Sequence, residues 1–155
     1  MPVIVIGADT ALGAEITNGL VPRDGEVRAF VTDPEAARAL RDLGIKVAVG
    51  DVSDGSHVGG AALNCFCAIL IADATSDDRE RAFAVTADEV AAAWAEGIDD
   101  AAVSRVVWVG DGPIPKAFLS AEREQASVPT TGRTSADIVD RVLRLEEAAR
   151  VPEDG

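Results

Sequence analysis

The chain has few basic residues and no long apolar run. Its 155 residues include 14 Lys and Arg against 27 Asp and Glu, which gives a formal net charge of −13. Nucleic acids and anionic membrane surfaces both require a positive protein surface, so we expect neither as a partner. The most apolar stretch, 65–72, is also far shorter than the ~20 residues that a membrane-spanning helix needs.

Cysteine, histidine and tyrosine are scarce. The chain has two cysteines, Cys65 and Cys67, a single histidine, His57, and no tyrosine. A C-x-C pair with one histidine is a poor ligand set, so we predict no metal site and two reduced, buried thiols in a cytoplasmic protein. No basic, apolar leader is visible at the N-terminus. No Ser/His/Asp or Cys/His set at a plausible spacing indicates nucleophilic catalysis.

The most informative stretch runs from residue 3 to residue 16. The β-branched run 3–6 predicts a strand that is buried on both faces, and Gly7 ends it. From Ala11 onward apolar residues recur at every fourth position, as on one face of a helix. A strand that turns tightly into a helix directs backbone N–H groups and a helix N-terminus at whatever lies above the turn. That arrangement attracts phosphate.

Strand and helix patterns alternate along the whole chain. We predict strands at 3–6, 26–31, 45–49, 65–72 and 105–109. We predict helices at 11–20, 33–42, within 51–62, from 75 or 76 to 96 with Phe83, Val90 and Trp94 facing the sheet, at 116–125, and at about 134–150. This alternation predicts a three-layer α/β fold of the Rossmann type: a five-stranded parallel sheet of order 3-2-1-4-5 with helices on both faces. We expect a single domain over 1–155, with a frayed tail at 151–155.

Three parts of the sequence resemble one family. Gly7, Thr10 and Gly13 occupy the positions of G-x-x-G-x-x-G, 27–34 reads VRAFVTDP, and 47–52 reads VAVGDV. The chain thus resembles the atypical short-chain dehydrogenase/reductases, the NmrA-like and epimerase-like branch, whose corresponding segments read GATGxxG, VRALVRDP and VVVGDL. It departs from that pattern at the middle glycine, which is Thr10, and at Asp9, which adds a negative charge.

The resemblance implies a set of cofactor contacts. The residues it assigns to an NAD or NADP molecule are Gly7, Asp9, Thr10, Ala11, Leu12, Gly13, Thr32, Asp33, Asp51, Val52, Ala72 and Asp73. Within this set, Asp33 lies where an acidic residue binds a ribose hydroxyl, and Asp51 lies at the adenine. Each of these two acids is alternatively a helix cap. Thr32 stands where NADP-binding relatives often have arginine, so NAD is slightly preferred, although Arg38 is close enough in sequence to reach back.

The catalytic residues of the family are missing. Its usual proton donor is the tyrosine of a Tyr-x-x-x-Lys pair, and this chain has no tyrosine. The family also has a serine at the end of the fifth strand, where this chain has Asp111. The remaining candidates are Asp111 and Lys116, with solvated loop residues as the alternative interpretation.

These observations leave three functional hypotheses open. The first is a non-catalytic NAD(P)-binding sensor or regulatory module. The others are a small NAD(P)H-dependent oxidoreductase or epimerase with a nonstandard proton donor, and an interaction scaffold whose nucleotide site is vestigial and binds no cofactor. Family members continue with further strands and helices, so we expect the fifth strand to lie at the edge of the sheet here. Either the last helix or a second copy in a homodimer would cover that edge.

Overall fold

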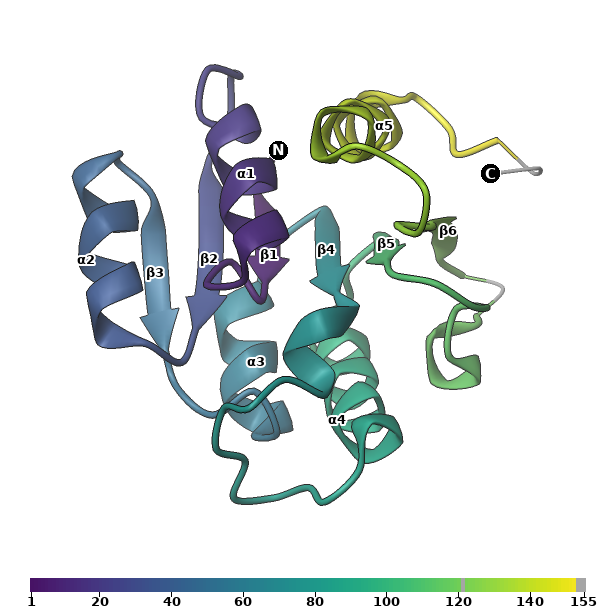
Figure 1. The fold of residues 1–155 in the computed structure, drawn as a ribbon. Helices are drawn as coiled ribbons and strands as arrows, with labels where there is room; N and C mark the ends of the chain where they lie inside the picture. The colour runs from purple at the N-terminus through teal and green to yellow at the C-terminus, as the bar shows by residue number, and fades with distance from the viewer. Residues whose placement is uncertain (121, 153–155) are drawn as a thin grey trace.

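The computed structural model describes residues 1–120 and 122–152. Its centre is a parallel sheet of six strands in the order β3-β2-β1-β4-β5-β6 (Figure 1). The strands are β1 (Val3–Ile6), β2 (Val27–Val31), β3 (Lys46–Val49), β4 (Cys67–Ile71), β5 (Arg105–Val109) and β6 (Glu124–Val128). The predicted Rossmann-like class and the order of the first five strands are confirmed. The predicted number of strands is wrong by one.

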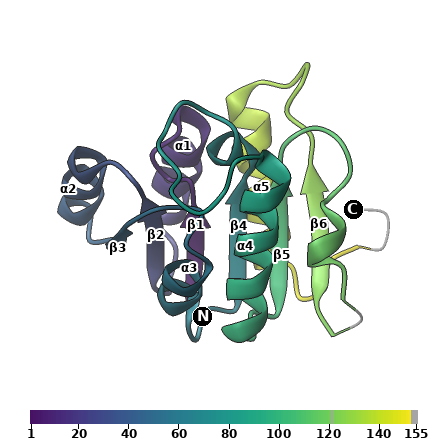
Figure 2. The ribbon, with the colours of Figure 1, turned by 90° about the horizontal axis from the view of Figure 1, so that it is seen from below.

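In the residues that the structure describes, five α-helices cover the two faces of the sheet (Figures 1 and 2). They are α1 (Ala11–Leu20), α2 (Pro34–Asp42) and α5 (Ser135–Glu147) on one face, and α3 (Gly55–Ala62) and α4 (Ala87–Asp100) on the other. Two short 3₁₀ helices follow β4 and β5, namely η1 (Ala72–Thr75) and η2 (Lys116–Phe118). No helix in the described part of the chain is both long and apolar enough to cross a membrane.

Each face of the sheet carries its own hydrophobic core. Successive β1 side chains alternate between the two cores, with Val5 packed toward α1, α2 and α5 and Ile4 toward α3 and α4. A strand covered on both sides must be apolar at every position, which is why the run 3–6 predicted β1 correctly. Cys65 and Cys67 are free and buried in these cores, as predicted.

The start of α4 differs from the prediction. This helix begins at Ala87, because Thr86 accepts a hydrogen bond from the Glu89 N–H while the Glu89 carboxylate accepts one from the Thr86 N–H. Such a reciprocal capping box is a stronger start signal than a single hydroxyl. Residues 76–86 therefore form an irregular segment, and Phe83 is 68% exposed rather than packed on the sheet. Val90 and Trp94 are buried against the sheet, as predicted.

The segment 116–125 was predicted to be a helix, and this is wrong. It holds η2, and its last residues enter β6, which pairs in parallel with β5. Ala126 and Val128 alternate with half-buried polar residues, the period of a strand with one face on the core. Another strand thus covers the edge of β5, and the homodimer stays a prediction.

Arg105 links β5 to the end of the chain. Its guanidinium is fully buried and donates to the carbonyl oxygens of Leu145 at 2.9 Å and Ala148 at 2.6 Å, and to the Glu124 carboxylate at 2.8 Å. These bonds satisfy carbonyl groups that the end of α5 leaves free. Helix α5 accordingly ends at Glu147, earlier than the predicted 150. Residues 153–155 of the predicted frayed tail lie outside the described residues.

Candidate functional site

The parallel strands bring the predicted site residues to one edge of the sheet. Their positions follow the strand ends: 7–13 after β1, 32–33 after β2, 51–52 after β3, 72–73 in η1 after β4, Asp111 after β5, and Lys116 in η2. β2 and β4 lie on opposite sides of β1, so the strand order changes direction at β1. Ligands of open α/β sheets bind at such a point.

The turn after β1 depends on its two glycines. Gly7 has a φ of +94° and lies so close to η1 that a Cβ there would be 2.9 Å from the Ala74 Cβ. A Cβ on Gly13 would be 2.1 Å from the Gly7 carbonyl oxygen, which no side chain tolerates. Both glycines are therefore required by the close approach of strand, helix and η1, whether or not a ligand binds.

Thr10 closes the turn as the N-cap of α1. Its hydroxyl donates to the Gly7 carbonyl at 2.8 Å and accepts from the Gly13 N–H at 2.9 Å. The N–H groups of Ala11 and Leu12 have no acceptor among residues 1–120 and 122–152. These are first-turn groups that point out of the helix N-terminus. They leave two donors free for an anion above the turn.

Asp9 connects the ends of β1 and β2. One of its carboxylate oxygens accepts from the N–H groups of Thr32 at 2.8 Å and Asp33 at 3.2 Å. The other oxygen pairs with Arg79 at 2.9 Å. Since the Asp9 side chain is only 6% exposed, this charge is held by its partners rather than by water.

Arg79 was not predicted to belong to the site. It lies in segment 76–86, which we call the strap, and its guanidinium reaches the Thr32 hydroxyl at 3.3 Å besides pairing with Asp9 and Asp77. Burial opposes the charge of Arg79, yet the two carboxylates raise its pKa. Arg81 pairs with Asp77 as well, at 2.7 Å. The strap thus places two arginines and the Asp77 carboxylate beside Asp9 at the end of β1.

The strap also reaches the end of β3. The Ala82 N–H donates to the Asp51 carboxylate at 2.6 Å, and the Phe83 N–H donates to the Ser53 hydroxyl at 3.0 Å. Partial burial works to raise the pKa of Asp51, but the Ser53 and Ala82 hydrogen bonds lower it. Figure 2 shows the strap crossing the carboxyl edge between η1 and α4.

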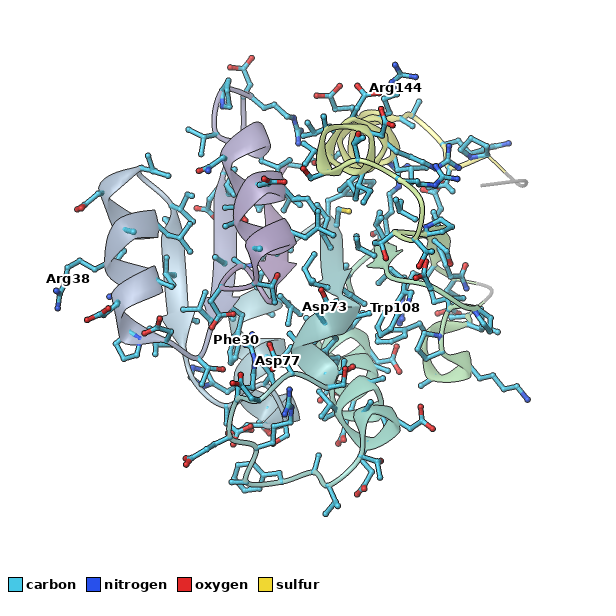
Figure 3. All side chains as sticks on the ribbon, in the orientation of Figure 1. Phe30, Arg38, Asp73, Asp77, Trp108 and Arg144 are labelled. Atoms are coloured by element: carbon cyan, nitrogen blue, oxygen red, sulfur yellow. The ribbon has the colours of Figure 1, made fainter. Side chains whose placement is uncertain are left out.

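Two residues considered for the ribose face elsewhere. Asp33 is the N-cap of α2 and accepts from the Glu35 N–H at 3.0 Å, which matches the alternative of a simple helix cap. Arg38 lies on the outer side of α2 and points away from Asp77 (Figure 3). The charged side chains that bind the first residues after β2 are instead Asp9 and Arg79.

At the opposite end of the site, Asp111 connects the end of β5 to the loop after β6. Its carboxylate accepts from the N–H groups of Thr130 at 2.9 Å and Thr131 at 3.1 Å, and also from both hydroxyls. These hydrogen bonds lower the pKa of Asp111 to about 2. It is therefore ionised at neutral pH and holds no proton to donate. Lys116 lines a groove of about 440 Å³ with Ile114, beside the first turns of α4.

Sequence reasoning missed the strap because Arg79 and Asp9 are 70 positions apart. The only signal was the alternation of acidic and basic residues in 76–81, which reads SDDRER and was assigned to the first turns of a helix. In the described part of the chain, no group of three or more His, Cys, Asp or Glu side chains is placed to hold a metal ion.

A family model described as NAD(P)H-binding matches residues 7–142, most of the chain. The chain belongs to this NAD(P)H-binding family. A comparison with curated proteins finds no match. The family match supports the predicted dinucleotide site, whereas the role of each residue in it stays a prediction.

Solved structures share the fold at low identity. The anaerobillin reductase ChuY of Escherichia coli O157:H7 aligns with a TM-score of 0.71 at 16% identity, over 97% of this chain and 92% of its own. Citrobacter triphenylmethane reductase, solved with NADP(H), gives 0.59 at 18% identity, over 93% of this chain and 45% of its own. The NADPH-dependent quinone oxidoreductase of Escherichia coli, solved with NADPH, gives 0.58 at 20%, over 70% and 36%. At these identities the likeness shows the fold alone.

Proposed function

We propose that this member of the NAD(P)H-binding family is a sensor: it binds the dinucleotide at the carboxyl edge and reports occupancy through the strap, without catalysis. The free N–H groups of Ala11 and Leu12 receive the pyrophosphate at the positive end of the α1 dipole. Asp9 and Asp51 hold the ribose and adenine of the adenosine half. This follows the family pattern at Asp51 and departs from it at the ribose.

The observation that carries the sensor role is that the strap already occupies both of these carboxylates. Arg79 donates to Asp9, and the Ala82 N–H donates to Asp51. A ribose hydroxyl and an adenine amino group would need the same acceptor oxygens. Dinucleotide and strap therefore compete for one set of partners, and a ligand that binds only one of two conformations shifts their populations.

The lack of the tyrosine that usually donates the proton in the family supports a non-catalytic role. The chain has no tyrosine, and Asp111 is an ionised carboxylate fixed between two threonines. General acid catalysis requires a group that carries a proton at the working pH. Asp111 therefore does not supply this proton.

Binding is tested by calorimetric titration with NAD, NADH, NADP and NADPH, using the wild type and Ala11→Pro. Ala11 is the first helical residue, where proline is tolerated, and Thr10 before it is already extended, with ψ at 160°. The substitution removes one free N–H and leaves the fold intact, so we expect at least tenfold weaker binding. The matched control is Ser135→Pro, at the first position of α5 behind Thr134, where binding should be unchanged. Equal affinities of the two variants would contradict the proposed pyrophosphate site.

The report through the strap is tested by hydrogen exchange followed by mass spectrometry. We expect peptides that cover the strap to exchange faster when a saturating dinucleotide is present, because the Ala82 N–H loses its acceptor on Asp51. Peptides from α5 serve as the internal control and should not change. Unchanged or slower exchange in the strap, with binding proven by calorimetry, would contradict the sensor role.

A small NAD(P)H-dependent reductase is the second candidate. The three named neighbours are reductases or oxidoreductases by name, and the groove at Ile114 and Lys116 follows the end of β5, beside the first turns of α4. Oxidation of NADH and NADPH should then depend on an added quinone or tetrapyrrole acceptor, and Lys116→Met should slow it. No oxidation above the rate without protein would exclude this candidate for those acceptors.

A further inference from the structure

The carboxylate of Asp9 lies at the end of β2, against the first two residues after that strand. In Rossmann folds an acidic residue at the end of β2 binds the ribose 2′-hydroxyl of NAD, whereas an arginine there accommodates the 2′-phosphate of NADP. The sequence offers Asp33 for this role, but its carboxylate caps α2. Asp9 instead reaches the end of β2 from the turn after β1, through the N–H groups of Thr32 and Asp33.

The hydrogen-bonding capacity of this position suits a hydroxyl. The two backbone N–H groups that would bind a phosphate are already used by one oxygen of Asp9, and the other oxygen, which Arg79 now occupies, is an acceptor. A ribose 2′-hydroxyl can replace the guanidinium and donate to that oxygen. A 2′-phosphate has no proton to offer there at neutral pH and would place its negative charge beside a carboxylate that is 6% exposed.

The positive charge of Arg79 does not favour a 2′-phosphate as long as its guanidinium is paired as it is in this structure. Its guanidinium is paired with Asp9 and through two nitrogens with Asp77, while Arg81 shares Asp77. These four side chains sum to zero charge, and the chain as a whole carries −13. While Arg79 is paired in this way, this cluster offers no uncompensated positive charge to a phosphate dianion.

We propose that Asp9 is the residue that selects NAD(H) over NADP(H) in this protein, and that Asp33, the position expected from sequence, does not. This inference rests on the proposed function, since it presupposes that a dinucleotide binds at the carboxyl edge. The negative charge of Asp9, which distinguishes this turn from the GATGxxG pattern, thereby acquires a function in cofactor selection. Removing that charge releases Arg79, whose guanidinium then becomes available to the 2′-phosphate.

The test compares NADH and NADPH affinities, by calorimetry, for the wild type, Asp9→Asn and Asp33→Asn. Asparagine keeps the shape of each side chain, and at position 33 it remains a good N-cap. We expect the wild type to bind NADH at least tenfold more tightly than NADPH. Asp9→Asn should lower this preference at least tenfold, and Asp33→Asn should change it by less than twofold. Adding Arg79→Met to Asp9→Asn should remove the gain in NADPH affinity.

The outcomes separate this inference from the function beneath it. A wild type that binds both dinucleotides equally, or NADPH more tightly, would overturn the role of Asp9 and leave dinucleotide binding standing. An equal change of preference in Asp33→Asn and Asp9→Asn would also overturn it. No heat with either dinucleotide, from a protein with a cooperative unfolding transition, would overturn the proposed function and the selectivity together.

Discussion

Replacing Thr10 with glycine should weaken the fold and strengthen dinucleotide binding at the same time. The hydroxyl of Thr10 now links the Gly7 carbonyl to the Gly13 N–H, at 2.8 and 2.9 Å. Without it, α1 loses its N-cap, and the turn regains the middle glycine of the family pattern. The Gly13 N–H then becomes a third donor beside those of Ala11 and Leu12.

The magnitudes follow from these bonds. Replacing a threonine N-cap with glycine costs about 0.3 kcal/mol, and the added freedom of glycine in the unfolded chain about 0.5 kcal/mol more. For a chain of this length each kcal/mol lowers Tm by roughly 2–4 °C, so we expect a decrease of about 2–3 °C. A new hydrogen bond to a charged phosphate contributes about 1.5 kcal/mol, which corresponds to roughly tenfold tighter binding.

The assay pairs thermal unfolding with calorimetric titration and includes Thr134→Gly as a control. Thr134 caps α5 in the same way, since its hydroxyl accepts from the Asp137 N–H at 3.1 Å. This control should lose a similar amount of stability while its dinucleotide affinity stays unchanged. Thr10→Gly binding no more tightly than the wild type, with its Tm lowered as expected, would refute the reasoning that Thr10 competes with the ligand for the Gly13 N–H.

Three further predictions concern the fold. Arg105→Met should lower the free energy of unfolding in urea by about 3–5 kcal/mol, because it leaves the Glu124 carboxylate and the last α5 carbonyls without their buried partner; a loss below about 1 kcal/mol would contradict this role. The pKa of Asp111 is lowered to about 2 from an ordinary 3.8. Its contribution to stability is therefore present above pH 4 and is lost as the pH falls from about 4 to about 2. Asp111→Asn should reduce the pH dependence of the urea unfolding midpoint over that range. Burial raises the pKa of the Cys67 thiol, so a thiol reagent should modify it only in denaturant, and rapid modification of the native protein would show that β4 is accessible.

The sequence was most informative where one physical demand decides the structure. The central strands are apolar at every position because helices cover both faces. This pattern can be recognised in the sequence without knowing which helices do so. The start of α4 was harder, because Thr75, Ser76 and Thr86 are all acceptable caps and only the reciprocal bond with Glu89 distinguishes the last. Strand β6 has apolar residues only at alternate positions and depends on pairing with β5, a contact that local propensity does not record.

For the site, spacing after each strand located the residues but not their partners. Asp51 and Asp33 were expected as ligand contacts or as helix caps, and their hydrogen bonds in the structure are with Ala82, Ser53 and Glu35. The contact of Arg79 with Asp9 depends on the path of an irregular segment with no periodic signal. Such contacts follow from the tertiary structure, and sequence patterns alone do not predict them.

The strap is also separable from the rest of the protein. Among its residues, all of which the structure describes, only Ala84 packs against a hydrophobic core. Its other anchors are polar bonds to η1 and to the residues that follow β1, β2 and β3. Its length and sequence can therefore change by insertion, deletion or grafting without disturbing the sheet, provided that a cation at the position of Arg79 still pairs with the buried carboxylate of Asp9. Swapping this segment among proteins of the same fold offers a practical way to build dinucleotide-responsive proteins with different outputs on one unaltered scaffold.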